Sequence, residues 1–164
     1  MEYSPDGKHI ASGVLDSTIC IWDTNIREVV LGPWKWHNSH VYSVVYSPDG
    51  KHIVPGSLDS TVCVWDVKTG ELVSGPLKGY NGTVFSVAYS SDGKNIVSGS
   101  LDGTAHVWNT DIRHVVPGPF KGHYGSVLSM DYFSNGKHIA SGSHDNTIYI
   151  WNAETREVVL EALK

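Results

Sequence analysis

An internal repeat of 43 residues runs through the whole of this 164-residue chain. Residues 3–33 agree with residues 46–76 at 20 of 31 positions, which excludes a coincidental match. Four tryptophans and four aspartates keep the same step: Trp22, Trp65, Trp108 and Trp151, and Asp16, Asp59, Asp102 and Asp145. A period of this length is typical of arrays of equivalent units, each of which buries its apolar surface against its neighbours. The sequence therefore predicts four stacked units rather than one continuous core.

Each repeat alternates turn sequences with short apolar runs. In the second repeat, the turn at 47–50 precedes the run 52–54, and the turn at 56–60 precedes the run 61–65. Runs of β-branched and aromatic residues between Asp, Gly and Ser clusters indicate short antiparallel strands joined by hairpins. The run 18–22 is apolar at both its odd and its even positions, so both faces of its sheet are expected to be covered. The predicted fold class is all-β, with four four-stranded antiparallel sheets.

A dipeptide that begins with tryptophan ends the third run of each repeat. These dipeptides are Trp22-Asp23, Trp65-Asp66, Trp108-Asn109 and Trp151-Asn152, and Gly122-His123 precedes the last repeat. On these residues the chain resembles the WD-repeat family, whose fold is a β-propeller. The resemblance covers essentially the whole chain and implies blades at approximately 1–33, 37–76, 80–119 and 123–164. The near-identity of the repeats is similar to the repetitive WD arrays at the C-terminal ends of fungal NACHT-type proteins.

The resemblance also implies a hydrogen-bonded network inside each blade. In the family, the His before the innermost strand bonds the Asp of the second hairpin, and the network reaches a strand-two Ser and the Trp indole. Carried over here, these structural positions are His37, Ser57, Asp59 and Trp65 in the second blade and His123, Ser143, Asp145 and Trp151 in the fourth. The first blade offers Asp16 and Trp22, and the third offers Asp102 and Trp108.

Two blades depart from this pattern. Tyr80 stands where the third blade should have His, so Asp102 is expected to need another donor. Pro55 interrupts strand two of the second blade. A His, Asp and Ser set could also be read as a hydrolase triad. The set recurs in each complete blade without an oxyanion-hole signature, so the chain is predicted not to be an enzyme.

Candidate partner-binding residues stand at two positions that point toward the central channel in WD-repeat proteins. One position, just before the turn aspartate, holds Leu15, Leu58, Leu101 and His144. The other, around the start of the innermost strand, holds His40, Tyr42, Phe85 and Leu128. Trp36 replaces the family glycine and is added as a further candidate. The alternative interpretation, weighed equally, is that these side chains pack on neighbouring loops.

Charge and composition exclude several other functions. The net charge of −5 opposes the basic surface that nucleic acids and anionic membranes require, and no apolar run approaches membrane-spanning length. Cys20 and Cys63 are read as copies of one position rather than as a disulfide pair. With no signal-peptide pattern, the expected location is cytoplasmic. No cofactor or metal is expected, because the histidines are spread over separate blades or lack a third ligand: His9, His52 and His138, and the pair His37 and His40.

The first blade is expected to be truncated at its innermost strand, because the segment that matches residues 79–86 is absent before it. The family's blades are shaped for larger rings, so four blades would leave an apolar face open at each end. A homodimer through contacts between the first and fourth blades would complete an eight-bladed ring. The competing interpretation is a fragment of a longer array, or an engineered repeat, with no independent function.

The leading functional hypothesis is a non-catalytic scaffold that binds a protein or peptide partner. A carbohydrate-binding propeller is the alternative, in which each blade would repeat one shallow sugar site. The candidate side chains at one register differ between blades (Tyr42, Phe85 and Leu128), and this difference favours a protein partner.

Overall fold

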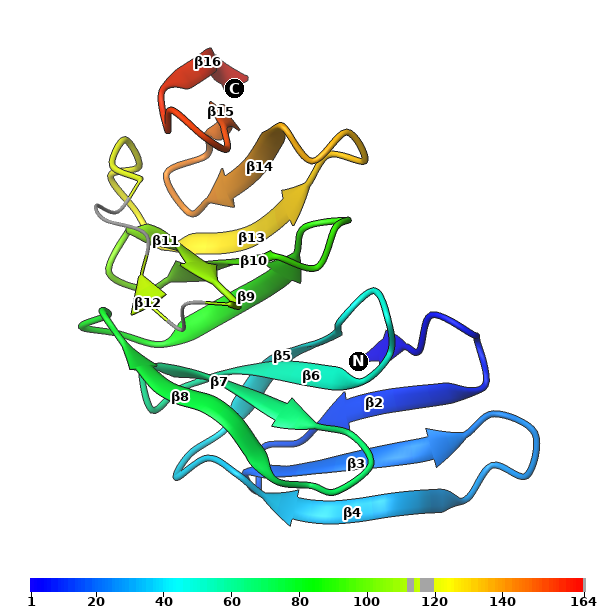
Figure 1. The fold of residues 1–164 in the computed structure, drawn as a ribbon. Coiled ribbons are helices and arrows are strands. Elements are labelled where there is room, and N and C mark those ends of the chain that lie inside the picture. Colours follow the sequence, from blue (N-terminus) through cyan, green and yellow to red (C-terminus); the bar gives the residue numbers. More distant parts are fainter. Residues whose placement is uncertain (112–113, 116–119, 164) are drawn as a thin grey trace.

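The 43-residue period corresponds to four antiparallel sheets of four strands each (Figure 1). This computed structural model describes residues 1–111, 114–115 and 120–163. The strands of the first and second sheets are β1 (Glu2–Tyr3), β2 (His9–Gly13), β3 (Thr18–Asp23), β4 (Val29–Lys35), β5 (Val41–Tyr46), β6 (His52–Ser57), β7 (Thr61–Asp66) and β8 (Leu72–Lys78). Those of the third and fourth are β9 (Val84–Tyr89), β10 (Asn95–Ser100), β11 (Ala105–Asn109), β12 (His114–Val115), β13 (Val127–Tyr132), β14 (His138–Ser143), β15 (Ile148–Asn152) and β16 (Val158–Leu163).

Each sheet is an up-and-down meander, in which every strand pairs with the strand that follows it in sequence. This topology follows from the turn sequences, which are too short for any crossover. The turn at 47–50 shows how they work: the Ser47 hydroxyl donates to Asp49 Oδ1 at 2.6 Å and accepts the backbone N–H of His52 at 2.9 Å. Gly50 has a φ of 72°, a conformation that costs glycine little. All-β architecture with four antiparallel sheets is therefore confirmed.

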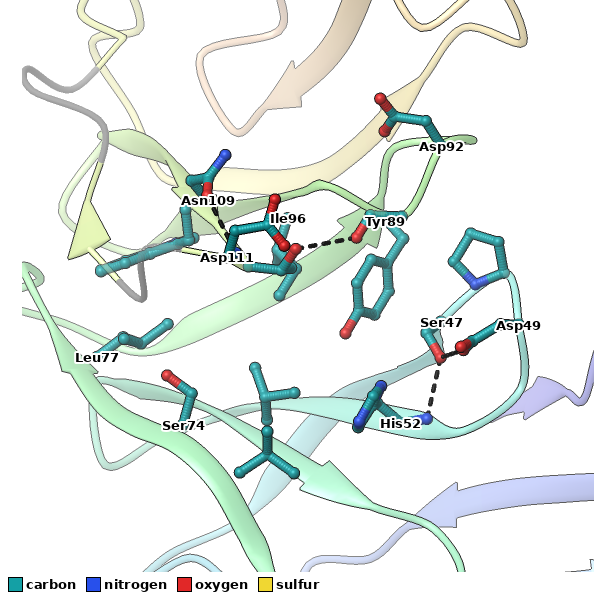
Figure 2. Close-up of a pocket in the computed structure, with 16 residues that line it drawn as sticks. Ser47, Asp49, His52, Ser74, Leu77, Tyr89, Asp92, Ile96, Asn109 and Asp111 are labelled. Carbon is teal, nitrogen blue, oxygen red and sulfur yellow. Dashed lines mark hydrogen bonds between the residues drawn. The ribbon is translucent and has the colours of Figure 1, made fainter.

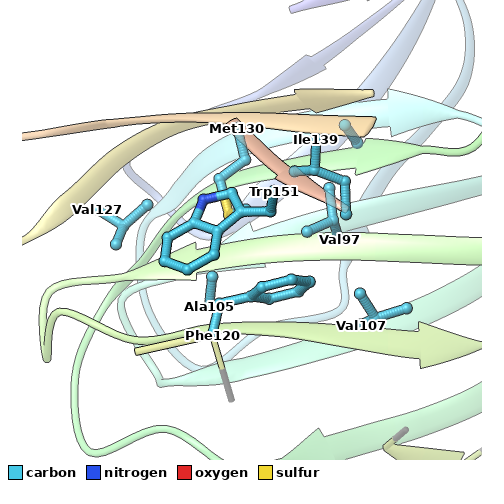
Figure 3. Packing of buried hydrophobic residues seen from close by; sticks show 9 residues of the cluster. Val97, Ala105, Val107, Phe120, Val127, Met130, Ile139 and Trp151 are labelled. Atoms are coloured by element: carbon cyan, nitrogen blue, oxygen red, sulfur yellow. The ribbon is translucent and has the colours of Figure 1, made fainter. Parts of the chain in front are cut away.

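Apolar side chains fill the spaces between consecutive sheets. One buried cluster joins the first and second sheets, another the second and third, and another the third and fourth. Figure 3 shows the last of these, where side chains of the fourth sheet meet those of the third: Val127, Met130, Ile139 and Trp151 on Val97, Ala105, Val107 and Phe120. Each sheet thus buries surface that it could not bury alone, as a repeat array requires.

The third strand of a sheet shows how burial depends on its place in the array. In the second sheet, Val62, Cys63 and Val64 are all buried, because neighbouring sheets cover both of its faces. In the first sheet Trp22 is 39% exposed, and in the fourth sheet Ile148 is 45% exposed. No hydrophobic cluster of the described residues joins the fourth sheet to the first, so the array is open. None of its described segments forms a helix that could cross a membrane.

Candidate functional site

The second-hairpin aspartates bind the loop that leads into the innermost strand. Asp59 Oδ1 accepts the hydroxyl of Thr61 at 2.6 Å, and Asp59 Oδ2 accepts His37 Nδ1–H at 2.8 Å and the backbone N–H of Asn38 at 3.1 Å. Burial by itself raises the pKa of Asp59, but the hydrogen bonds from His37 and Thr61 outweigh it and hold the pKa well below its usual range. The carboxylate is therefore ionised at neutral pH and clamps the hairpin to the preceding loop.

The fourth sheet contains a continuous chain of hydrogen bonds from the turn to the tryptophan. His123 Nδ1 lies 3.1 Å from Asp145 Oδ2, and His123 Nε2 lies 2.7 Å from Ser141 Oγ. Trp151 Nε1–H donates to the same Ser141 oxygen at 2.7 Å. With Nδ1–H donated to the carboxylate, Nε2 is left as the acceptor of the Ser141 hydroxyl, whose oxygen in turn accepts the indole N–H.

The serine in this chain differs from the one expected, and the assignment of Ser143 to the network was wrong. Trp151 pairs with Ile139 across the sheet, and Ser141 is two residues from Ile139 on the same face, so its hydroxyl reaches the indole. Ser143 lies at the end of β14, where its Oγ accepts the backbone N–H of Asp145 at 3.2 Å. Ser143 therefore supports the turn, and Ser141 holds the tryptophan.

The second sheet lacks this chain of hydrogen bonds because Pro55 stands 43 positions before Ser98, at the register of Ser141. His37 Nε2 and Trp65 Nε1 are buried without a hydrogen-bond partner among the described residues. Ser57, expected to belong to the network, instead accepts the backbone N–H of Asp59 at 3.1 Å. Two buried polar atoms are left unpaired, which is unfavourable for stability.

In the third sheet a tyrosine takes the place of the histidine in the equivalent hydrogen-bond network. The Tyr80 hydroxyl lies 2.6 Å from Ser98 Oγ, and Trp108 Nε1–H donates to that oxygen at 2.6 Å. Asp102, which has no histidine, accepts the backbone N–H of Asn81 at 2.8 Å. The equivalent backbone groups of Asn38 and Tyr124 bind the aspartates of the second and fourth sheets, so Asn81 is not a new donor in place of the histidine. Burial raises the pKa of Tyr80 well above its usual range, so the phenol stays protonated.

The first sheet contains the tryptophan and the aspartate of the network, but no chain of hydrogen bonds connects them as it does in the fourth sheet. Trp22 Nε1–H donates to Ser12 Oγ at 2.8 Å, and Asp16 Oδ1 accepts the hydroxyl of Thr18 at 2.6 Å. Unlike its counterparts Trp108 and Trp151, which are nearly fully buried, Trp22 is substantially exposed. Water can therefore reach this indole.

These networks have no geometry for hydrolysis. In the fourth sheet both ring nitrogens of His123 are engaged inside the sheet, and its side chain is only 2% exposed. A histidine held in this way is not open to a substrate, whereas a general base must come within hydrogen-bond reach of one. Within the parts of the chain that the structure describes, no group of three His, Cys, Asp or Glu side chains is placed to hold a metal ion. Cys20 and Cys63 are both free thiols.

Backbone hydrogen bonds bring the two sets of predicted partner-binding residues to one end of each sheet. The amide of Leu58 donates to the carbonyl of His40 at 2.9 Å, and the amide of His144 donates to that of Ser126 at 2.9 Å. The leucine side chains remain open to solvent at 62%, 40% and 50% for Leu15, Leu58 and Leu101. The turns that carry these leucines are thus fixed by the backbone while their side chains are free.

Aromatic side chains from neighbouring sheets meet on the same end. The rings of Tyr42 on β5 and Phe85 on β9 lie edge to face with their centroids 5.4 Å apart, and His40 lies 6.4 Å from Tyr42. Leu128 occupies the same register on β13 and is 46% exposed. We call these residues together with the turn leucines the loop face: Leu15, His40, Tyr42, Leu58, Phe85, Leu101, Leu128 and His144.

Trp36 does not share the surroundings of the loop face. Its ring is half-buried and stacks between Trp34 and Trp65, with centroid separations of 4.5 Å on each side. This stack lies against the cluster that joins the first two sheets. Trp36 therefore covers the indole that Pro55 leaves without a partner.

Four-stranded antiparallel meanders, stacked face to face and clamped by a turn aspartate, define the class of blade-forming repeat proteins. Within that class, the family model "WD domain, G-beta repeat" matches residues 1–23, 29–66, 71–109 and 115–152. These segments cover most of the chain, and the chain belongs to the WD-repeat family.

Individual relatives match over about one repeat. A "66 kDa stress protein" of Physarum polycephalum is 43% identical over 42 residues, which is 26% of this chain. An uncharacterized WD repeat-containing protein of Schizosaccharomyces pombe is 37% identical over 41 residues, which is 25% of this chain. In both cases the matched segment spans 7% of the relative's own length.

Proposed function

We propose that this chain is a non-catalytic scaffold that binds a protein or peptide partner through the loop face. WD repeats generally mediate protein–protein interaction, and the observation that supports this site is the contact between Tyr42 and Phe85 beside exposed leucines. Aromatic anchors on a rigid support contribute most to binding in interfaces of this kind. The resemblance to the arrays of fungal NACHT-type proteins rests on the near-identity of the repeats and remains part of this proposal.

The register of the loop face favours a protein over a carbohydrate partner. A sugar site repeated in each blade would need the same aromatic residue at the same position. Position 42 and its equivalents hold Tyr42, Phe85 and Leu128, so successive sheets present different surfaces. A surface that varies in this way suits one extended partner that contacts several sheets at once.

Removing the two rings together should weaken binding of peptides selected from a random display library on this chain. We expect the variant Tyr42→Ala with Phe85→Ala to bind the selected peptides about tenfold more weakly or worse, because aromatic anchors at interfaces cost more than 1 kcal/mol to truncate. Tyr124→Ala is the control, since this tyrosine is 98% exposed and lies outside the loop face. Equal binding to the double variant, or ligands found only on a glycan array, would contradict the proposal.

We also propose that a second copy of the chain covers the two open faces and completes an eight-bladed ring. Tyr3 is 62% exposed whereas Tyr46, its equivalent in the second sheet, is 6% exposed. On the fourth sheet Ile148 is 45% exposed, whereas its equivalents Ile19 and Val62 are fully buried. Ile19 and Val62 pack against the sheet that follows their own. The outer face of the fourth sheet exposes the equivalent residue, Ile148, and would therefore fit the open face of the first sheet in another chain.

The mass in solution tests this assembly. We expect about 36 kDa, twice the 17.9 kDa of one chain, by light scattering. Ile148→Asp should give an 18 kDa particle, because an unpaired charge on the contact face is costly to bury. Ile26→Asp is the control, because Ile26 is 59% exposed on an outer turn and should leave the mass unchanged. A wild-type chain that is folded at 18 kDa would contradict ring closure.

A further inference from the structure

A cavity of about 320 Å³ lies between the second and third sheets (Figure 2). Val64, Leu77 and Trp108 contribute apolar surface to its wall. Turn aspartates and Tyr89 contribute polar groups. Figure 2 shows the phenol of Tyr89 directed between the two sheets toward His52. The volume is that of a small ligand site, with an apolar wall and a few polar groups.

The same cavity occurs once more, between the first and second sheets, with a volume of about 310 Å³. Its lining residues are 4–6, His9, Tyr46, Asp49, Gly50 and Val67. Each of these eight positions recurs 43 residues later in the wall of the first cavity, and only Val67 changes type, to Thr110. Two cavities with matching walls follow from the repeat itself and are not isolated packing defects.

Aspartates line both cavities. Asp49 lines both of them, joined by Asp6 in one and by Asp92 and Asp111 in the other. The Ser47 hydroxyl lowers the pKa of Asp49, and the corresponding serines lower those of Asp6 and Asp92, so these three carboxyl groups are ionised at neutral pH. Among the described residues no lysine or arginine lines either cavity, and Lys51, which lies 3.4 Å from Asp49, has a side chain that is 73% exposed.

A buried tyrosine in one of these walls lacks a partner. Tyr46 is 6% exposed, and its hydroxyl makes no hydrogen bond to any described residue. Buried hydroxyl groups are almost always hydrogen-bonded in folded proteins. Tyr46 lines the cavity between the first two sheets, so a ligand that reaches its hydroxyl from there would provide the missing hydrogen bond.

We propose that these two cavities each bind the side chain of an arginine from a partner peptide. A guanidinium group is cationic and planar, donates five hydrogen bonds and tolerates contact with an apolar wall. It can donate to the carboxylates of Asp49 and of its neighbouring turn and to the tyrosine hydroxyl, in competition with the exposed lysine beside each turn. The cavities contain none of the loop-face residues, so this proposal and the proposed function can fail independently.

The boundary between the third and fourth sheets provides an internal contrast. There Asn95 stands in place of His52, and Asn135 in place of Asp92. That boundary has lost one of its two carboxylates and its histidine. It is therefore expected to bind arginine more weakly than the two cavities.

The test uses Nα-acetyl-arginine amide as the probe and its neutral citrulline analogue as the matched ligand, with amide chemical shifts of the whole chain as the readout. Arginine should give saturable shifts around Tyr46 and Tyr89, and citrulline should give none. Asp49→Asn should weaken binding at both cavities about two- to fivefold, the range for an accessible charge pair. The turn should survive, because Asn135 Oδ1 accepts the N–H of Lys137 at 2.9 Å as Asp49 accepts that of Lys51 at 3.1 Å.

Asp66→Asn is the control with the same change of charge. Asp66 lines neither cavity, and Asn152 holds the equivalent turn in the fourth sheet by accepting the N–H of Thr155 at 2.8 Å. We expect this variant to bind the probe as the wild type does. Equal binding of citrulline, shifts that lie away from both cavities, or an equal loss in the Asp66 variant would each overturn the proposal.

Discussion

Replacing Ser141 with alanine is expected to lower the free energy of unfolding by about 2–4 kcal/mol, because two buried polar atoms lose their partner at once. Ser141 Oγ lies 2.7 Å from both His123 Nε2 and Trp151 Nε1, and the serine and the tryptophan are 1% and 2% exposed. Water cannot replace the hydroxyl in such a site. Urea denaturation followed by tryptophan fluorescence measures the effect.

The control for this variant lies in the first sheet. Ser12→Ala removes the equivalent hydroxyl, which accepts Trp22 Nε1–H at 2.8 Å. Because Trp22 is 39% exposed in the single chain, water can take over that hydrogen bond in the monomeric Ile148→Asp background, and the loss there should stay below about 1 kcal/mol. Equal losses for the two alanine variants would show that burial of the network does not set its contribution.

The converse change is available in the second sheet. Pro55→Ser places a hydroxyl where His37 Nε2 and Trp65 Nε1 lack a partner. Satisfying both atoms should outweigh the flexibility that the unfolded chain gains when proline is lost, which costs roughly 0.4–1 kcal/mol. We expect a net gain of about 1 kcal/mol in the free energy of unfolding. A loss of stability in this variant would contradict the assignment of the network.

Replacing Gly99 with alanine should lower the free energy of unfolding by about 1–3 kcal/mol through overpacking. An added Cβ at Gly99 would lie 2.5 Å from Val127 Cγ1 and 3.1 Å from Met130 Cγ, both on the next sheet. Strand two of the third sheet approaches the innermost strand of the fourth so closely that even a methyl group must push them apart. Thermal or urea denaturation measures the change.

Gly142→Ala is the matched control, because it occupies the same register on the outer face of the fourth sheet. An added Cβ there meets nothing within 4 Å. In the monomeric Ile148→Asp background the substitution should be neutral, or stabilising by about 0.5–1 kcal/mol because alanine restricts the unfolded chain. If both variants lose stability equally, the close approach of adjacent sheets is not what requires glycine at Gly99.

The hydrogen-bond network shows where prediction from sequence succeeds and where it fails. A histidine before the innermost strand and an aspartate 22 residues later meet at 2.8 Å in the pair His37 and Asp59, because both belong to one sheet and a fixed period separates them. The serine that completes the chain was misassigned by two residues. Which serine bonds the tryptophan depends on which side chain of the second strand lies diagonally across from the indole. The residue types in the turn do not reveal that strand register.

The 43-residue period, the turn residues and the apolar runs determined by themselves that this chain forms four antiparallel sheets and that its core lies between them, since strand alternation and turn chemistry act over a few residues. Only the tertiary structure decided that the Tyr80 hydroxyl bonds Ser98, that Trp36 is stacked while Tyr42 is exposed, and that cavities lined by aspartates lie between sheets. Such features join side chains from different strands or sheets. Their distances depend on cross-strand register and on how closely the sheets stack, and neither quantity is encoded in a local run of residues.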